Sequence, residues 1–327
     1  MLGDMDNELV RSRDEASDRA YNMQLRQRFQ RGELLRLRPG FYCSAGSWKA
    51  AWPEDRYRLF ARAVGEETPG RMVIAESAAL LWGYPVVRPP AAVVVQAESA
   101  SRSGTTPARS IVPPGAPARM RGFAVRRRAV PVLPAVQLPD SGVSVPSRLG
   151  TVVQCAQYLD FPDAVVVMDA ARRPGSTLHL EDTDLRRAID AIASARNRRR
   201  ARRVFEFSTP ESESPGESLG RVLIYQLGFA PPVLQYKIRE DGRVFARSDY
   251  YWEAVRTVGE FDGRVKYGRA AAKAGMSEGD IVAAEKKRED RIRRTGRPVV
   301  RWVWEDLMRP ERLRRILTGA GIPRRGR

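Results

Sequence analysis

The segment from Ser214 to Asp262 limits the possible folds of this 327-residue chain more than any other feature. Ser214 is a favourable helix N-cap, and Pro215 and Glu217 stand at the first and third helical positions, as in a capping box. Three runs with strand composition follow this helix, at residues 235–239, 243–252 and 256–262. The short connection between the last two runs predicts an antiparallel hairpin. This part of the chain is therefore expected to combine a helix with a sheet.

The register of the hairpin brings acidic side chains together. With a turn centred between Ala254 and Val255, Asp249 lies opposite Glu260, and their Cβ atoms are about 5 Å apart. Because side chains alternate along a strand, Asp262 is on the same face as Glu260. Three carboxylates repel one another unless a cation neutralises them, and hard oxygen ligands suit Mg²⁺ or Mn²⁺. We predict that Asp249, Glu260 and Asp262 are metal ligands.

Lys266 is one of only six lysines and comes directly after these acids. An amine beside a metal site can orient the attacking water and stabilise negative charge on a phosphorane. The residue types suit metal-dependent hydrolysis of phosphodiester bonds, and the predicted catalytic residues are Glu217, Asp249, Glu260, Asp262 and Lys266. The alternative is an exposed hairpin face on which nearby arginines pair with the acids, namely Arg247, Arg264 and Arg269.

Residues 208–327 resemble the PD-(D/E)XK nuclease superfamily, and more closely its branch related to very-short-patch repair endonucleases. The matching residues are Glu217, Asp249 and the run 260–263, followed by a charged stretch at 285–290 and a closing segment at 296–307. The resemblance implies a three-layer, restriction-endonuclease-like domain with a mixed sheet, which cleaves DNA with Mg²⁺. The chain departs from the family pattern because Asp262 stands where the lysine is expected. The amine then has to come from Lys266, Lys286 or Lys287, and otherwise the site binds metal without cleaving.

Residues 1–70 combine a basic helix with a basic hairpin. The stretch 19–31 has Tyr21, Leu25 and Phe29 on one stripe, Gly32 as its stop, and two strands joined by a Pro-Gly turn after it. A winged helix places such a helix in the major groove and the hairpin against the DNA backbone. The predicted DNA contacts are Arg26, Arg28, Arg31, Arg36 and Arg38. The alternative is a small helical cap with solvated arginines.

Residues 71–207 alternate short apolar runs with helical patterns, which predicts a small α/β domain. Strands are expected at 72–74, 92–95 and 123–125, and helices at 77–83, 165–171 and 185–194. The segment 97–117 is rich in Ser, Thr, Gly and Pro, so we expect a flexible loop. An arginine tract follows at 196–203, where Arg198, Arg199 and Arg200 are predicted phosphate contacts; a solvated helix end is the alternative.

Residues 20–200 resemble the AbiEi-type antitoxins of bacterial abortive-infection systems. The resemblance rests on Arg-Gly-Glu-Leu at 31–34, Pro-Gly-Phe-Tyr at 39–42 and the run from Ala75 to Pro85. It implies a winged-helix transcriptional repressor with a second α/β domain that neutralises a nucleotidyltransferase toxin. The chain is thus expected to be an α/β (α+β multidomain) protein with three parts, at residues 1–70, 71–207 and 208–327. Two hypotheses about its function follow. It is a Mg²⁺-dependent DNA endonuclease, or an antitoxin-type regulator that has an inactive nuclease-like domain and a cognate toxin as partner.

The composition favours nucleic acid as the partner and excludes several other classes. The chain has 57 Lys and Arg against 39 Asp and Glu, a net charge of +18, which favours a polyanion such as double-stranded DNA. With only Cys43, Cys155 and His179, a disulfide framework, a Cys-based zinc site and most His-based catalysis are excluded. The sequence lacks a membrane-length apolar run and a signal-peptide pattern, so we expect a cytoplasmic protein without a membrane partner. The oligomeric state stays open.

Overall fold

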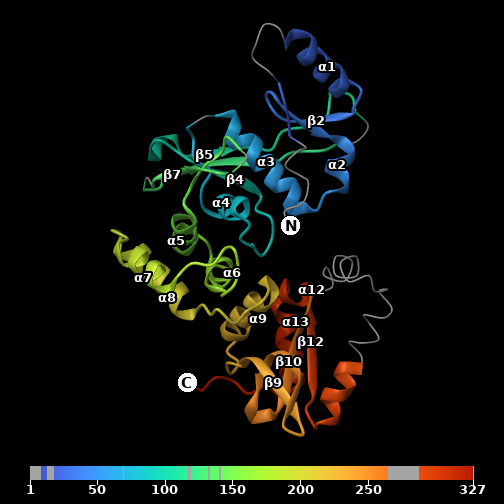
Figure 1. Ribbon diagram of the computed structural model, residues 1–327, viewed down its shortest axis with the longest axis vertical. Helices are drawn as coiled ribbons and strands as arrows, with labels where there is room; N and C mark the ends of the chain where they lie inside the picture. The colour runs from blue at the N-terminus through green and yellow to red at the C-terminus, as the bar shows by residue number, and fades with distance from the viewer. Residues whose placement is uncertain are drawn as a thin grey trace. The chain divides into compact units, whose positions relative to one another are not determined.

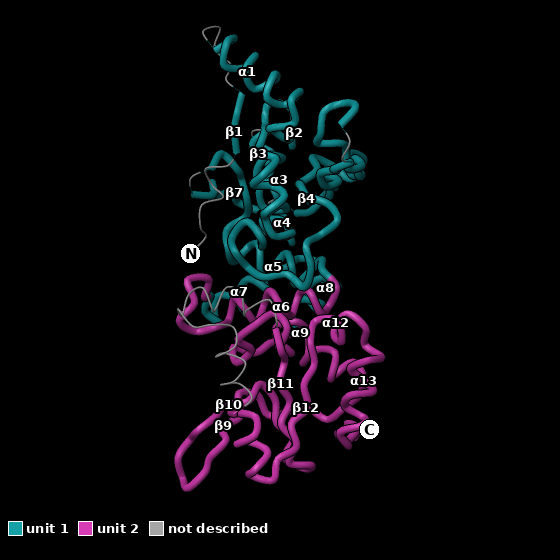
Figure 2. The backbone as a smooth tube through the Cα atoms, turned by 90° about the vertical axis from the view of Figure 1, so that its right-hand side faces the viewer, with its two compact units in different colours: residues 1–159, 180–203 teal, residues 160–179, 204–327 magenta. Residues whose placement is uncertain are grey.

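The computed structural model describes residues 9–12, 18–68, 70–116, 119–131, 133–139, 141–263 and 287–326. The chain divides into two compact units (Figures 1 and 2): unit 1 comprises residues 1–159 and 180–203, and unit 2 comprises residues 160–179 and 204–327. Both units contain helices and strands, which confirms the mixed α/β class. The three-part division at residues 70 and 207 stays a prediction. Among the described residues, no helix has the length and apolar character needed to cross a membrane.

The N-terminal part of unit 1 is a helix beside a three-stranded antiparallel sheet in the order β1-β3-β2. Its elements are β1 (Val10–Arg11), α1 (Arg19–Gln30), β2 (Leu34–Arg38) and β3 (Phe41–Ser44). The predicted helix and hairpin are confirmed. Gly32 has a φ of +74°, a left-handed conformation that ends α1 and turns the chain into β2. Leu25 of α1 packs on Leu34 and Tyr42 of the hairpin.

The remainder of unit 1 places helices around a small mixed sheet in the order β4-β6-β5. The helices are α2 (Ala45–Ala50), α3 (Pro53–Glu67), α4 (Ala75–Trp82), α5 (Arg148–Tyr158) and α7 (Asp182–Asp190). The strands are β4 (Ala92–Gln96), β5 (Gly104–Thr106), β6 (Ala124–Arg128), β7 (Ala135–Gln137) and β8 (Ser144–Pro146). Strand β6 is parallel to β4 and antiparallel to β5. The core between helices and sheet includes Tyr57, Phe60 and Val93, all buried.

Two expectations for unit 1 need correction. Residues 72–74 do not form the predicted strand and make only an isolated bridge between Val73 and Val95. The reason is that the Val73 amide donates to the Ser144 carbonyl and not to a neighbouring strand of this sheet. The predicted loop at 97–117 contains the 3₁₀ helix η3 (Ala100–Arg102) and strand β5. Its order comes from pairing with β6 and from the buried Ile111, both of which are tertiary contacts.

Unit 2 is built on a four-stranded mixed sheet in the order β12-β11-β10-β9. The strands are β9 (Val233–Glu240), β10 (Arg243–Trp252), β11 (Thr257–Asp262) and β12 (Val299–Val303). The helices are α6 (Phe161–Arg172), α9 (Pro215–Gln226), α12 (Trp304–Leu307) and α13 (Pro310–Gly319), with η4 (Glu253–Val255) between β10 and β11. Residues 287–294 are also helical and precede β12, which is parallel to β11. Helix α8 (Ala195–Phe207) begins in unit 1 and ends in unit 2.

A buried ion pair attaches α6 to the rest of unit 2. The Asp169 carboxylate, which is fully buried, accepts hydrogen bonds from Arg221 of α9 at 2.9 and 3.1 Å. It also accepts one from the backbone amide of Thr209 at 2.8 Å. The Arg172 guanidinium donates to the Ser208 carbonyl at 2.6 Å. Helix α6 lies within the predicted middle part, yet these bonds place it in unit 2.

We expect Asp169→Ala to lower the free energy of unfolding by about 3 kcal/mol, because it leaves the nearly buried Arg221 guanidinium without its carboxylate. Urea unfolding followed by circular dichroism measures the effect. Asp190→Ala is the matched control, since both partners of the Asp190–Arg202 pair are more than half exposed, and should cost less than about 1 kcal/mol. Equal losses in the two variants would contradict the buried-pair interpretation.

Candidate functional site

The hairpin of β10 and β11 has the register that the sequence predicts. Tyr251 pairs with Val258, and Tyr250 pairs with Gly259. Continuing this register places Asp249 across from Glu260. At this point the Asp249 carboxylate accepts the backbone amide proton of Phe261, with an oxygen–nitrogen distance of 2.8 Å. The side chain of Asp249 is therefore fixed at the edge where the two strands stop pairing.

Helix α9 lies close against the face of the hairpin that carries Tyr250 and Phe261, opposite to the face of Asp249 and Glu260. The Tyr250 hydroxyl, fully buried, donates to the carbonyl of Glu217 at 2.7 Å. A Cβ on Gly216 would meet the Phe261 ring at 2.0 Å, and a Cβ on Gly220 would meet the Tyr250 hydroxyl at 2.6 Å. The two glycines permit this close approach of helix and sheet. It brings Glu217, at the start of α9, to the same end of the sheet as Asp249.

Glu217 has a capping role and a place in the site. Its backbone amide donates to the Ser214 hydroxyl at 3.2 Å, which confirms Ser214 as the N-cap. In return the Glu217 carboxylate accepts the Ser214 hydroxyl at 2.7 Å and the Glu213 amide at 2.8 Å. The return bond thus reaches the residue before the N-cap, one position earlier than in a standard capping box. A further bond, from the Gln235 side chain at 3.0 Å, links Glu217 to β9.

Asp249 and Glu260 differ in how their charge is balanced. The pKa of Asp249 is raised to about 7, mainly by burial and also by the nearby carboxylates Glu217 and Glu260, while the Phe261 amide and Arg288 act to lower it. Glu260 is buried, and its Oε2 atom lies 2.6 Å from Nη2 of Arg288 and 3.3 Å from Nη2 of Arg301. Two guanidinium groups therefore neutralise the carboxylate of Glu260.

The predicted ligand role of Asp249, Glu260 and Asp262 stays a prediction. Among the described residues, no three acids, histidines or cysteines lie close enough together to hold a metal ion. The physical reason is that the Glu260 carboxylate is bound by arginines and Asp249 by a backbone amide. The residues fit an arginine-neutralised cluster better than a preformed Mg²⁺ or Mn²⁺ site.

The cations in this cluster are not those that the sequence suggests. Lys266, Lys286, Arg264 and Arg269 lie outside the described residues, and Lys287 is exposed at the start of the helical residues 287–294. Arg247 pairs with Glu213 at 2.6 Å. Arg288 and Arg301 are not among the residues that the sequence predicts for the site. Arg301 is opposite Glu260 only because β12 is parallel to β11, a pairing without a local sequence signal.

The predicted DNA contacts of the N-terminal part differ in their partners. Arg28 and Arg31 both contact Glu33, at 3.2 and 2.6 Å, and Arg38 pairs with Glu67. Arg26 and Arg36 are exposed. Within the described ranges, no carboxylate pairs with either of these two. Their positions, on α1 and β2, match a helix and wing that present cations to solvent.

The arginine tract of α8 is partly used inside the protein. Arg198 donates to the Ile192 carbonyl at 2.6 Å, and Arg200 donates to the Leu159 carbonyl at 2.9 Å. Arg199 is exposed. Two of the three predicted phosphate contacts thus also donate to backbone carbonyls, and the phosphate role of the tract stays a prediction.

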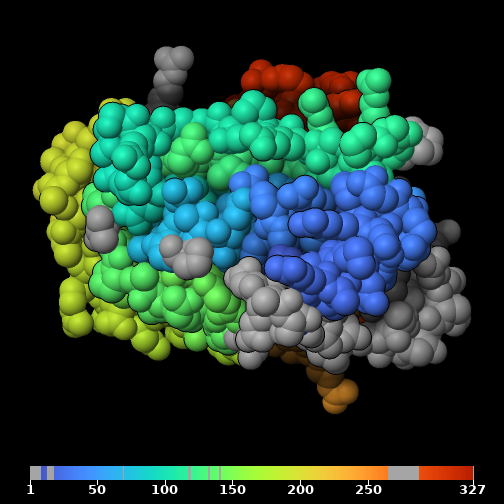
Figure 3. Space-filling model, turned by 90° about the horizontal axis from the view of Figure 1, so that it is seen from above, coloured from blue at the N-terminus to red at the C-terminus, as the bar shows by residue number. Residues whose placement is uncertain are grey.

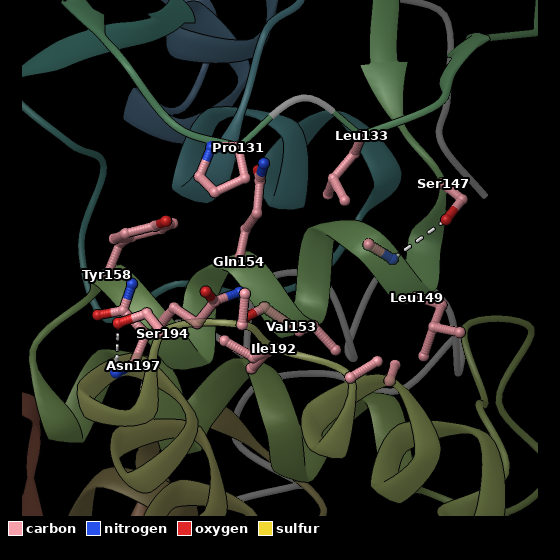
Figure 4. A pocket seen from close by; sticks show the side chains of 15 residues that line it. Pro131, Leu133, Ser147, Leu149, Val153, Gln154, Tyr158, Ile192, Ser194 and Asn197 are labelled. Atoms are coloured by element: carbon pink, nitrogen blue, oxygen red, sulfur yellow. Dashed lines mark hydrogen bonds between the residues drawn. The ribbon is translucent and has the colours of Figure 1, made fainter. Parts of the chain in front are cut away.

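An apolar hollow of about 450 Å³ lies in unit 1 beside α5 (Figure 4). Its lining is mostly aliphatic, with Pro131 and Leu133 on one side and Ile192 on the other, and it includes no charged residue. Two serines at its edge cap helices: Ser147 accepts the Gly150 amide and Ser194 accepts the Asn197 amide. The hollow thus has no cationic side chain to attract a phosphodiester.

Comparison with known proteins adds little about function. No family model matches the sequence. Two proteins of Mycobacterium tuberculosis, "Uncharacterized protein MT2308" of strain CDC 1551 / Oshkosh and "Uncharacterized protein Rv2248" of strain ATCC 25618 / H37Rv, are 31% identical over 115 residues. That match covers 34% of this chain and 40% of each relative. The crystal structure of the RV2827C protein from Mycobacterium tuberculosis covers 65% of this chain and 74% of its own, with 14% identity and a TM-score of 0.33.

The raised pKa of Asp249 predicts a pH-dependent stability. In the folded state the Asp249 carboxyl group keeps its proton up to about pH 7, whereas in the unfolded chain it releases the proton at about pH 4. Stability should therefore fall as the pH rises between these values and change no further above them. Relative to Asp249→Asn, which keeps the acceptor for the Phe261 amide, we expect the wild type to lose about 2 kcal/mol between about pH 5 and about pH 7.5. The midpoints of urea unfolding, measured for both proteins at both pH values, test this expectation. An equal change in the wild type and in Asp249→Asn would contradict it.

Proposed function

We propose that this chain is a DNA-binding regulator that has a nuclease-like C-terminal unit whose Glu260 carboxylate is held by arginines. The observation that carries the proposal is the contact of the Glu260 carboxylate with Arg288 and Arg301. A guanidinium at 2.6 Å binds the Oε2 atom of Glu260 and competes with a divalent cation for this carboxylate. The residues of the acid cluster then stabilise the unit and do not carry out hydrolysis.

The topology of unit 2 supports the nuclease-like part of the proposal. In chain order, helix α9 is followed by the antiparallel strands β9, β10 and β11, a helical crossover segment and the parallel strand β12. A mixed sheet in this order, with a helix at its start, agrees with the resemblance of residues 208–327 to the PD-(D/E)XK superfamily. Asp249 and Glu260 stand on neighbouring strands, as that resemblance implies.

The DNA-binding part rests on charge and on the helix–hairpin arrangement. The net charge of +18 favours a polyanionic partner, because a protein that neutralises phosphates releases counterions. Arg26 on α1 and Arg36 on β2 are both exposed. The two elements follow one another in the chain, as the recognition helix and the wing do in a winged helix. A regulator of the antitoxin type, with a nucleotidyltransferase toxin as its second partner, is the role that the AbiEi resemblance implies.

A Mg²⁺-dependent endonuclease is the second candidate, favoured by the carboxylates that meet at the end of β10. Glu217 and Glu260 both raise the pKa of Asp249, so the three acids share one electrostatic environment. This candidate requires a metal ion to displace Arg288 from Glu260. Lys266 would then be the amine beside the acids.

Double-stranded DNA should bind with lower affinity when the cations of α1 are removed. We expect Arg26→Gln with Arg28→Gln to weaken binding about tenfold and to reduce its dependence on salt. Fluorescence anisotropy with a labelled duplex, repeated over a series of KCl concentrations, measures both effects. Arg314→Gln with Arg315→Gln on α13 removes the same charge elsewhere and should have little effect. Unchanged binding by the α1 variant would remove the winged-helix interpretation.

Supercoiled plasmid distinguishes the two candidates. With Mg²⁺ or Mn²⁺ the wild type should retard the plasmid without nicking it, because the carboxylate of Glu260 is bound by arginines. The assay includes a chelator and the variants Glu260→Ala and Asp249→Asn as controls. Metal-dependent nicking that both variants abolish would establish the endonuclease and overturn the regulator proposal for unit 2.

A further inference from the structure

Three adjoining hollows on unit 1 share their lining arginines. The first, of about 420 Å³, is lined by Arg36, Arg38 and Arg109. The second, of about 250 Å³, shares Arg38 with it and adds Arg71 and Arg127. The third, of about 420 Å³, shares Arg71 and Arg127 with the second and adds Arg102. Because each hollow shares residues with the next, they form one arginine groove, defined by Arg36, Arg38, Arg71, Arg102, Arg109 and Arg127.

Cations outnumber acids in the arginine groove. Only two carboxylates line it, Glu67 and Glu98, so its formal charge is six minus two, or +4. Glu67 pairs with Arg38, and the pair of Glu98 with Arg102 is about 70% exposed on both sides. The described part of the chain offers no carboxylate partner to the other four arginines, which are Arg36, Arg71, Arg109 and Arg127. Their guanidinium groups are available to an external anion.

The sheet holds the central arginine of the groove in place. Arg127 is in register with Val95 across the parallel β4–β6 pair, and Val95 and Val125 line the same hollow. Its Nη1 atom donates to the Thr106 hydroxyl at 2.9 Å, which directs the guanidinium along β5. Hydroxyl side chains also line the groove, at Thr68, Ser101, Ser103, Thr106 and Ser110. Arginines interleaved with small hydroxyl residues are the groups that proteins use to contact phosphates.

The groove continues from the hairpin that is proposed to contact DNA. Arg36 and Arg38 belong to β2, whereas Arg102, Arg109 and Arg127 come from the η3–β6 region. In the space-filling view the N-terminal segment, in blue, borders this region, in teal to green (Figure 3). A single small anion would need cations that converge on one point, but these arginines follow one another along three hollows. A polymer of phosphates is the ligand that matches such an arrangement.

We propose that the arginine groove binds the phosphate backbone of double-stranded DNA and extends the contact made by α1 and the β2–β3 hairpin. The inference rests on the proposed DNA binding of this chain. It assigns Arg71, Arg102, Arg109 and Arg127, which the sequence did not indicate, to phosphate contact. Contact with phosphates positions the protein without reading bases, so the groove adds affinity that does not depend on sequence.

The test is the salt dependence of binding to a fluorescein-labelled duplex of arbitrary sequence, for the full chain. We expect Arg71→Gln with Arg127→Gln to lower affinity about tenfold and to reduce the slope of log K against log salt by about 2. Arg71→Lys with Arg127→Lys keeps the charge and should keep the slope. Arg186→Gln with Arg187→Gln, both exposed on α7, is the matched control. Circular dichroism and thermal unfolding verify that each variant is folded. If the Arg71→Gln with Arg127→Gln variant does not fold, Arg109→Gln, at an exposed position, takes its place.

The outcomes separate this inference from the proposed function. If the wild type binds DNA and the Arg71 and Arg127 glutamine variant binds with an unchanged slope, the groove is not a phosphate contact, although DNA binding stands. If the wild type binds no DNA, both proposals fail. If inorganic phosphate stabilises the wild type against heat but not the glutamine variant, while the DNA slope is the same, the groove takes small anions and the proposal is overturned.

Discussion

The contact of Glu260 with two arginines joins parts of unit 2 that are distant in sequence. Glu260 belongs to β11, Arg288 to the helical residues 287–294 and Arg301 to β12. Arg301 also reaches Glu289 at 3.1 Å, so the crossover segment is bound on both sides. Removing both arginines would leave the buried Glu260 carboxylate without compensation, which costs several times more than a surface pair gives. The network therefore adds to the β11–β12 ladder in holding β12 in the mixed sheet.

The same contact explains why the chemistry of the site is hard to infer from its residues alone. A carboxylate on each of two neighbouring strands is compatible with a divalent cation or with guanidinium groups. The choice depends on which cations the fold brings to the pair. Here Arg288 and Arg301 reach Glu260 through a parallel crossover, and Asp249 is bound by a backbone amide. The order of elements in unit 2 and the arginine-held carboxylate are thus independent properties of the unit.

Local signals in the sequence were sufficient for most elements. Capping at Ser214, the stop at Gly32 and the register of the β10–β11 hairpin depend on residues that are neighbours in sequence, and all three are confirmed. The missed features depend on distant contacts. Strand β5 is ordered by pairing with β6, and the arginine groove gathers residues from β2, η3 and β6. No window of the sequence contains both sides of these contacts, so a residue pattern could not predict them.

The discontinuous division of the chain has a consequence for its synthesis. Helix α6 belongs to unit 2, but residues 180–203, which follow it, return to unit 1. Asp169 therefore leaves the ribosome 52 residues before its partner Arg221. At the usual rate of elongation this is a wait of about 3 to 10 s, in which the apolar side of α6 lacks its final cover. Unit 1 can be completed in that interval, so folding in order of synthesis favours unit 1 first.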